Sequence, residues 1–172
     1  IRRLAKQMSF QTIGPNKLNQ LCHVRFFKDV ENIKAHMKKQ AALIRPKFNL
    51  VLNTLQTELG DKNIATWSKP NGGYFISLNT LEGCAKGVVQ LAAQAGVIFT
   101  KAGATFPYGL DPRDQNIRIA PTYPPLRELK MAMELFAICL QLVSIRKILN
   151  DRAVRNKPQT LTFQAVKEAQ IV

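Results

Sequence analysis

The sequence predicts an α/β fold, more narrowly a small α+β domain in which long amphipathic helices cover a small mixed or antiparallel sheet. Apolar residues recur every three or four positions over residues 29–59 and again from about Pro125, as in amphipathic helices. Residues 65–78 and 116–121 instead carry β-branched and aromatic side chains, which favour strands. Glycines and prolines separate these segments, so helices and strands follow one another along the chain.

The composition is that of an ordinary globular protein. The 172 residues suffice for one domain, or for a small domain with appendages, and 46% of them are hydrophobic and 21% charged. No apolar run reaches the roughly 18 residues of a membrane span, and no signal peptide is expected. The chain opens without methionine, so we expect that an upstream portion is missing.

Cysteine and histidine usage argues against disulfides and metal sites. Cys22, Cys84 and Cys139 are scattered and odd in number, and His23 and His36 are the only histidines. We therefore expect a reducing compartment, a cytoplasmic location and no bound metal ion.

The first long helix is expected to begin at Asp29, which can cap its first turn, and to end at Gly60. Pro46 lies within the apolar pattern and should kink or divide the helix. The apolar face consists of Ile33, Met37, Ala41, Ile44, Phe48, Val51, Leu52, Leu55 and Leu59.

The elements between the two long helices are short. We expect a strand with a turn, a helix, a strand, a loop and a strand, at residues 65–78, 82–96, 97–103, 104–115 and 116–121. Pro70 to Gly73 form the turn, and Gly96 closes the short helix. The last helix begins near Pro125, a residue that suits a first helical turn. Its apolar face consists of Leu129, Met133, Phe136, Ala137, Leu140 and Val143.

These segments suggest a chain of three parts. Residues 1–28 are interpreted as the end of a preceding domain or a linker, broken at Gly14-Pro15 into irregular or short-helical pieces. Residues 29–145 form the small domain. Residues 146–172 begin with basic residues and have weaker periodicity, so partial helix or disorder is expected there.

The chain is strongly basic, with 25 Lys and Arg against 11 Asp and Glu, a formal charge of +14 and a pI of about 10.1. Much of the excess lies in residues 1–47, where Asp29 and Glu31 are the only acids. The basic residues there are Arg2, Arg3, Lys6, Lys17, Arg25, Lys28, Lys34, Lys38, Lys39, Arg45 and Lys47. Such a bias can mark a nucleic-acid surface, a solvated helix face or one half of an interface. No helix-turn-helix or aromatic-interleaved basic motif accompanies the charge, so nucleic-acid binding is not expected.

Arg118 stands out because it interrupts the apolar strand segment NIRIAP. Side chains alternate along a strand, so Ile117 and Ile119 face one side and Arg118 the other. If that other face is solvent, the arginine carries no function. If it opens on a cleft, a rigid strand presents a guanidinium group, which suits a substrate carboxylate through two parallel charge-assisted hydrogen bonds.

Other catalytic motifs are absent from the sequence. No phosphate loop, dinucleotide fingerprint or G-x-S-x-G elbow is present. Asp111 and Asp114 share a loop with Arg113, which we interpret as a solvated turn rather than a pair of catalytic carboxylates.

Three motifs nevertheless follow one another in a specific order. A P-x-G-G-x-F strand motif is matched by Pro70, Gly72, Gly73 and Phe75. A second segment is matched by Val97, Gly103 and Phe106, with Ala102 where many relatives have proline. The third motif, N-x-R-[IL]-x, is matched by Asn116 and Arg118. Over about residues 9–144 the chain thereby resembles the C-terminal part of pyridoxal-phosphate-dependent aminotransferases of the aspartate aminotransferase superfamily. Within that superfamily, its motif sequences are most similar to those of the MocR-like or alanine–glyoxylate-type branch.

The resemblance implies the small C-terminal domain of a fold-type I enzyme of amino-acid metabolism. Such an enzyme moves an amino group between an amino acid and a 2-oxo acid, uses pyridoxal 5'-phosphate as its cofactor, and is a homodimer in its full-length form. Arg118 would bind the substrate α-carboxylate, and Asn116, Gly73 and Phe106 would also contact the substrate.

The same resemblance implies that the Schiff-base lysine lies upstream of this chain, so no catalytic residue is assigned. The segment TWSK, which ends at Lys69, is similar to the S-x-S-K-like segment that carries the Schiff-base lysine in the family. It directly precedes the Pro70 turn, however, where the family has no such lysine. We therefore expect the isolated chain to be inactive. The alternatives are an inactive homologue, or a basic module that binds nucleic acid or another polyanion on the same small α/β fold.

Overall fold

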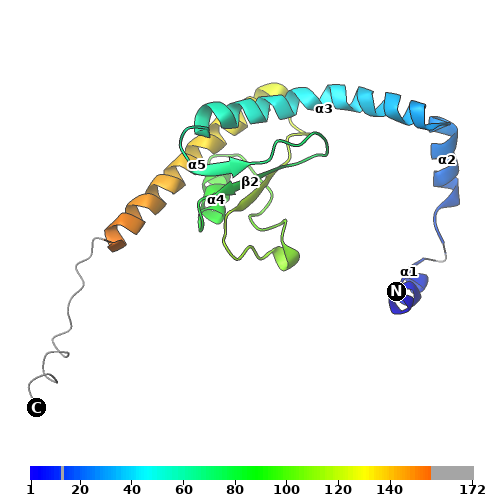
Figure 1. Cartoon of the computed structure of the whole chain (residues 1–172), viewed down its shortest axis with the longest axis horizontal. Helices are drawn as coiled ribbons and strands as arrows, with labels where there is room; N and C mark the ends of the chain where they lie inside the picture. The colour runs from blue at the N-terminus through cyan, green and yellow to red at the C-terminus, as the bar shows by residue number, and fades with distance from the viewer. Residues whose placement is uncertain (13, 156–172) are drawn as a thin grey trace, which may run out of the picture. The chain divides into compact units, whose positions relative to one another are not determined.

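The computed structural model describes residues 1–12 and 14–155 and divides into two compact units, Ile1–Pro46 and a unit that begins at Lys47 (Figure 1). The division into three parts, with boundaries after residues 28 and 145, stays a prediction. Residues 156–172, which make up most of the predicted tail, lie outside the described residues.

The first unit is helical. It contains α1 (Arg2–Gln11), α2 (Lys17–Phe27) and the first half of α3 (Val30–Leu59). The side chain of Asn16 caps α2 by accepting a hydrogen bond from the backbone N–H of Asn19 at 2.9 Å. The rings of Phe26 and Phe27 each meet His36 edge-on, with centroids 5.6 and 5.4 Å apart. The predicted short-helical entry is confirmed over the residues that the structure describes.

Helix α3 begins and ends at the predicted residues. Asp29 accepts a hydrogen bond from the N–H of Asn32 at 2.8 Å, and the helix stops before Gly60. Pro46 does not end the helix, although its missing N–H leaves the carbonyl of Ala42 without the usual helical partner. Pro46 is also the last residue of the first compact unit.

The second unit contains an antiparallel sheet of three strands in the order β1-β2-β3. The strands are β1 (Ala65–Trp67), β2 (Ile76–Thr80) and β3 (Asn116–Ile119). Pairing of Trp67 with Leu78 joins β1 to β2, and pairing of Ser77 with Arg118 joins β2 to β3. The predicted turn at residues 70–73 therefore lies in the loop of a hairpin, and β2 begins at Ile76 rather than at Tyr74.

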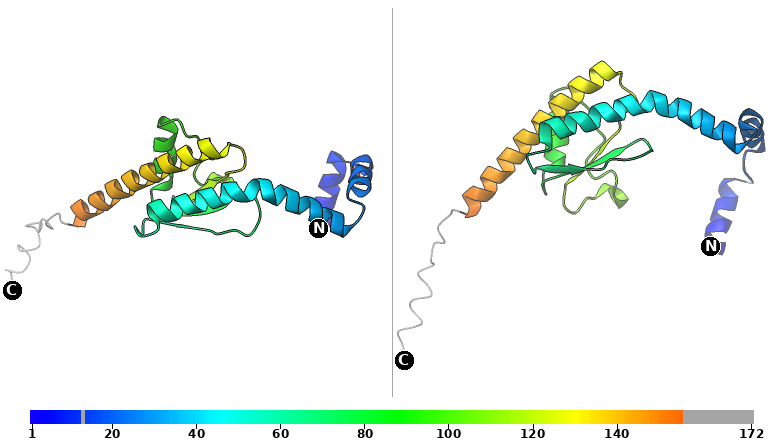
Figure 2. Two further views of the ribbon diagram at one scale, coloured as in Figure 1. Left: turned by 90° about the horizontal axis from the view of Figure 1, so that it is seen from above. Right: turned by 45° about the horizontal axis from the view of Figure 1, so that its top comes forward.

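One face of this sheet is covered by helices. Figure 1 and the right-hand view of Figure 2 show α5 (Leu126–Arg155) and the part of α3 after Pro46 on the same side of the strands. A further helix of this unit, α4 (Ala85–Gln94), packs against α5 and β3. The fully buried side chains at this interface include Val51, Leu55, Leu59, Ile76, Leu78, Val88, Ile117, Met133, Phe136 and Leu140. The predicted sheet, covered on one side by amphipathic helices, is confirmed.

The strand predicted at residues 97–103 is wrong. No strand lies between α4 and β3; residues 97–100 have no regular secondary structure, and the short 3-10 helix η1 (Pro107–Gly109) follows later. A strand needs a neighbour to pair with, and among the described residues β3 pairs only with β2. Phe99 instead packs against Phe136 in a tilted arrangement with ring centroids 4.8 Å apart, while Ile98 is 88% exposed.

Helix α5 continues past the predicted boundary at residue 145 and ends at Arg155. An (i, i+4) ion pair between Lys147 and Asp151, 3.0 Å apart, lies within this extension. The predicted partial helix is therefore present over residues 146–155.

Replacing Phe136 with alanine tests this core. The ring is fully buried and packs against Phe99, so Phe136→Ala is expected to lower the free energy of unfolding by about 3–5 kcal/mol. Urea denaturation followed by circular dichroism measures the change. Ile138→Ala on the same helix is the matched control, because Ile138 is 56% exposed and its loss should change stability by about 0.5 kcal/mol or less. Equal effects of the two substitutions would contradict this description of the core.

Candidate functional site

The second face of the sheet is polar. Along β2, Ile76, Leu78 and Thr80 are buried, whereas Ser77 and Asn79 between them are exposed or half-buried. In β3, Ile117 and Ile119 are buried, Arg118 between them is half-buried and Asn116 is buried. Pairing of Ser77 with Arg118 and of Asn79 with Asn116 brings these polar residues to one face. We call Ser77, Asn79, Asn116 and Arg118 the polar face.

Arg118 lies half-buried in the polar face, beside an aromatic ring. Its guanidinium carbon is 4.5 Å from the ring centroid of Phe75. Phe75 precedes β2 by one residue and is diagonal to Arg118 across the strand pair. Among residues 1–12 and 14–155, no carboxylate lies within ion-pair distance of this guanidinium, and its buried Nε has no hydrogen-bond partner. A planar cation is thus held on a strand without a counter-ion from the described part of the chain.

Asn116 is the centre of a hydrogen-bond network that joins three segments. Its Nδ2 donates to Ser77 Oγ at 2.9 Å and to Asn79 Oδ1 at 2.7 Å. Its Oδ1 accepts a hydrogen bond from Thr105 Oγ1 at 2.7 Å. Asn116 is 8% exposed, and both N–H groups of its side-chain amide are occupied. Asn116 therefore holds the loop that contains Thr105 against β2 and β3.

Asp111 fixes the start of β3 through its carboxylate. The carboxylate accepts hydrogen bonds from the backbone N–H groups of Arg113, Gln115 and Asn116 at 3.0, 2.8 and 2.9 Å. Partial desolvation alone would raise the pKa of Asp111, but these hydrogen bonds favour the ionised form and hold the pKa below its ordinary value of 3.8. The loop that we interpreted as a solvated turn is thus ordered around this carboxylate.

The neighbouring Asp114 blocks the N-terminus of α4. Its side chain accepts from the N–H of Lys86 at 3.1 Å, and its carbonyl accepts from the N–H of Ala85 at 2.9 Å. These two donors are therefore not available to a phosphate group.

Two other predicted site residues lie in the loops that flank the polar face. Gly73 is exposed and has a φ of 88°, so a side chain there would be strained, although a Cβ would meet no atom within 4 Å. Phe106 is half-buried and follows Thr105, the residue bound to Asn116. The structure thus brings Asn116 and Arg118 together on β3 and borders them with the loops that carry Gly73 and Phe106. Substrate contact by these residues stays a prediction.

Gly103 requires glycine for a different reason. It is buried with a φ of 80°, and a Cβ would lie 2.8 Å from the carbonyl oxygen of Gly109. The loop between α4 and β3 can close on itself only without this side chain.

The lysines do not form a cofactor site by themselves. Only Lys47 and Lys147 are half-buried among the lysines of the described chain; the others, Lys69 included, are exposed. Lys47 donates to the carbonyl of Thr122 at 2.6 Å, and Lys147 pairs with Asp151. No described lysine therefore combines burial with an uncommitted amine, which a Schiff-base residue needs.

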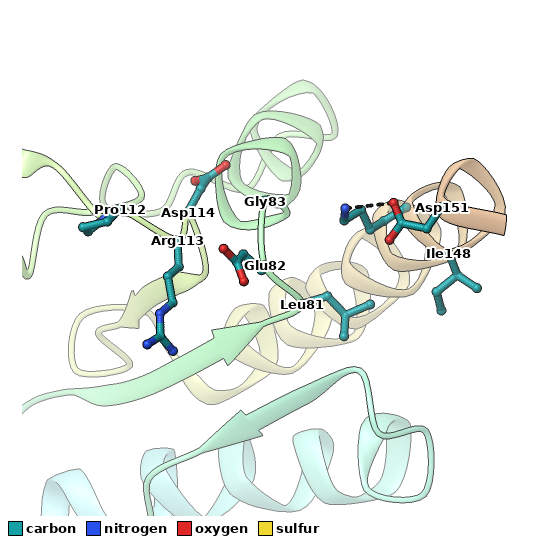
Figure 3. A pocket seen from close by; sticks show the side chains of 9 residues that line it. Leu81, Glu82, Gly83, Pro112, Arg113, Asp114, Ile148 and Asp151 are labelled. Carbon is teal, nitrogen blue, oxygen red and sulfur yellow. Dashed lines mark hydrogen bonds and ion pairs between the residues drawn. The ribbon is translucent and has the colours of Figure 1, made fainter. Parts of the chain in front are cut away.

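A surface hollow lies away from the polar face and is lined by Leu81, Glu82, Gly83, Pro112, Arg113, Asp114, Lys147, Ile148 and Asp151 (Figure 3). The side chain of Arg113 extends away from Asp151, so the charged groups of the hollow do not converge on one point (Figure 3).

No group of three or more His, Cys, Asp or Glu side chains that could hold a metal ion occurs in the described ranges. Within the same ranges, no helix is both long and apolar enough to cross a membrane.

Comparison with known proteins gives the family. A family model described as aspartate amino-transferase matches residues 1–152. An aspartate aminotransferase of Corynebacterium glutamicum is 46% identical over 138 residues, which cover 80% of this chain and 32% of that protein. The chain therefore belongs to the aspartate aminotransferase family, and the predicted aminotransferase resemblance is confirmed. Assignment to the MocR-like or alanine–glyoxylate-type branch stays a prediction.

Solved structures agree with this family. The crystal structure of an aspartate transaminase from C. glutamicum superposes with a TM-score of 0.77 at 44% identity, over 83% of this chain and 34% of that one. The α-aminoadipate aminotransferase of Thermus thermophilus, complexed with N-(5'-phosphopyridoxyl)-L-leucine, shares the fold at 17% identity, with a TM-score of 0.65 over 83% of this chain and 35% of that one. Pyridoxal phosphate is the cofactor of this family. The chain spans about one third of the length of the curated relatives that it matches.

Sequence reasoning missed contacts of the predicted site residues with their neighbours. Asp111 had a usable signal, since aspartate at the start of a loop commonly binds the N–H two residues later, as it does here with Arg113. Thr105 had none, because its contact with Asn116 depends on a loop path. Phe75 was matched to the P-x-G-G-x-F motif, but its contact with Arg118 was not predicted, because that contact depends on strand register.

Neutralising Asp111 tests the anchoring of β3. Because the folded-state pKa is lowered, the carboxylate stabilises the fold fully above its ordinary pKa, and this contribution is lost as the pH falls through the folded value. Asp111→Asn should therefore lower the urea midpoint at pH 7, and the gap in midpoint to the unmodified chain should narrow as the pH falls below the ordinary value of 3.8. Asp61→Asn is the control, because the side chain of Asp61 is 84% exposed. It should change neither the urea midpoint at pH 7 nor the pH dependence of that midpoint. A gap that is constant with pH would exclude the proposed role of the carboxylate charge.

Proposed function

We propose that this chain provides the substrate-carboxylate site of a pyridoxal-phosphate-dependent aminotransferase, with Arg118 as the residue that binds the α-carboxylate. Membership of the aspartate aminotransferase family supports the reaction class. The observation that carries the residue assignment is the guanidinium of Arg118 on the polar face, where no described carboxylate neutralises it. Amino acids and 2-oxo acids share a carboxylate next to the reacting carbon, and both are the proposed substrates.

The chemistry of this site follows from a planar cation on a rigid strand. A guanidinium group can donate two parallel hydrogen bonds to one carboxylate, which fixes the position and the orientation of that carboxylate. Arg118 is followed by the buried Ile119 and preceded by the buried Ile117, so its backbone cannot shift without disturbing the core. A substrate held in this way presents its reacting carbon in a constant position, which contributes to rate as well as to binding.

In this proposal, the lysine that forms the Schiff base with pyridoxal phosphate lies outside this chain. The exposed or engaged state of the described lysines supports this view, as does the capping of α4 by Asp114. We infer that the 172 residues alone do not transaminate. A homodimer as the full-length form and a cytoplasmic location belong to the same proposal.

Substitution of Arg118 tests the carboxylate assignment. The assay uses a chimaera in which this chain replaces the matching third of the C. glutamicum aspartate aminotransferase. Arg118→Lys keeps the charge but loses the paired hydrogen bonds, so kcat/KM for aspartate should fall about 100-fold or more. Arg113→Lys, at an exposed arginine in the preceding loop, should leave kcat/KM within about twofold. A fall that is equal in the two variants would refute the assignment.

Pyridoxal phosphate mixed with the isolated chain tests the lysine inference. Exposed lysines react weakly and without saturation, so the folded chain should give no more aldimine absorbance than the same chain unfolded in urea. The readout is the visible absorbance over a titration with the cofactor. A saturable band from the folded chain that disappears in Lys69→Arg would show that this chain holds the cofactor lysine after all.

A polyanion-binding module is the second candidate function. The observation that favours it is the basic excess of residues 1–47, where Lys38 and Lys39 are exposed on α3. Salt-dependent retention on heparin that is lost in Lys38→Glu/Lys39→Glu but kept in Arg118→Lys would support this candidate. An inactive homologue is the remaining alternative, and it would give no activity in the chimaera.

A further inference from the structure

We propose that Phe75 is a positioning residue for Arg118: its ring supports one face of the guanidinium group and keeps the edge of that group directed towards a carboxylate ligand. This inference rests on the proposed function of Arg118 and adds a residue that acts through it.

The strand register places the two side chains together. Ser77 pairs with Arg118, and Phe75 lies two residues before Ser77, so Phe75 and Arg118 are diagonal neighbours on the same face of the sheet. The guanidinium carbon of Arg118 lies 4.5 Å from the ring centroid, within the range of a cation–π contact. Ile76, between Phe75 and Ser77, is fully buried, which fixes the backbone from which the ring projects.

Stacking and carboxylate binding use different parts of the guanidinium group. The guanidinium carbon lies over the ring of Phe75. In the proposed arrangement the ring contacts the flat face of the guanidinium group, whereas the N–H bonds lie in the plane of that group and point outward from its edge. Both contacts can therefore be made at once. No described hydrogen bond holds the arginine side chain, so the ring of Phe75 is the identified contact that restricts its rotation.

The ring of Phe75 is only partly buried. Phe75 is 47% exposed, unlike the fully buried Phe136 of the core, so only part of its surface contributes to packing. The ring lies beside a guanidinium group that has no ion-pair partner among the described residues. Restricting a long side chain before its ligand arrives lowers the entropy lost on binding.

Nuclear magnetic resonance of the 172-residue chain tests the inference without catalysis. The Nε–H signal of Arg118, assigned by its loss in Arg118→Lys, is followed during titration with acetate, and sodium chloride at equal ionic strength is the control. Phe75→Leu removes the ring and keeps an apolar side chain, whereas Phe75→Tyr keeps the ring face. Backbone amide signals of β2 and β3 verify that each variant is folded, and Phe75→Met replaces Phe75→Leu if those signals change.

Three results would support the inference together. In the absence of acetate, Phe75→Leu should shift the Arg118 signal, because the ring current is lost. The dissociation constant for acetate should rise about threefold to tenfold in Phe75→Leu, which is the cost of ordering one long side chain. Phe75→Tyr should bind acetate as the unmodified chain does, within about twofold.

The contrary results separate the two proposals. Equal acetate binding by the unmodified chain and Phe75→Leu would overturn the role of Phe75 and leave the carboxylate assignment intact. An Arg118 signal in the unmodified chain that responds to acetate no more than to chloride would overturn the carboxylate assignment, and the positioning role would fall with it.

Discussion

The alternation of side chains in β2 and β3 is the constraint on which the rest of the second unit depends. Ile76, Leu78, Ile117 and Ile119 must all face the helices, since together they form the sheet's contribution to the core. A slip of one residue in register would exchange the two faces and bury the charge of Arg118. The apolar core therefore also determines on which face the arginine stands, and no separate interaction is needed to expose it.

The network around Asn116 adds a second, polar constraint on the same register. An almost fully buried amide is tolerated only when its donors and acceptor are satisfied, and a shift of β3 relative to β2 would break its bonds to Ser77 and Asn79 together. Its bond with Thr105 extends this constraint to the loop before β3. The border of the polar face is thus ordered by hydrogen bonds, whereas the opposite face is ordered by packing.

Local signals in the sequence predicted most of the fold and only part of the site. Helix α3 was placed within one residue because its apolar repeat, Asp29 and Gly60 all act locally. The sequence also indicated Arg118, since the alternation around it is local as well. The segment at residues 97–103 has strand-forming side chains, yet Phe99 packs on Phe136 instead, and this outcome depends on which strands find neighbours. The contact of Phe75 with Arg118 likewise depends on register.

The residues of this chain suit substrate binding better than cofactor binding. It contributes a cation on a rigid strand, whereas its described lysines are exposed or already engaged. In the proposed function, the group that Arg118 recognises is the carboxylate common to all amino acids and 2-oxo acids. Such a contact remains useful in both halves of a transamination, because the carboxylate is unchanged when the amino group leaves. A fixed, ring-supported guanidinium group suits this role better than a flexible lysine, since both substrates must place the same carbon at the same point.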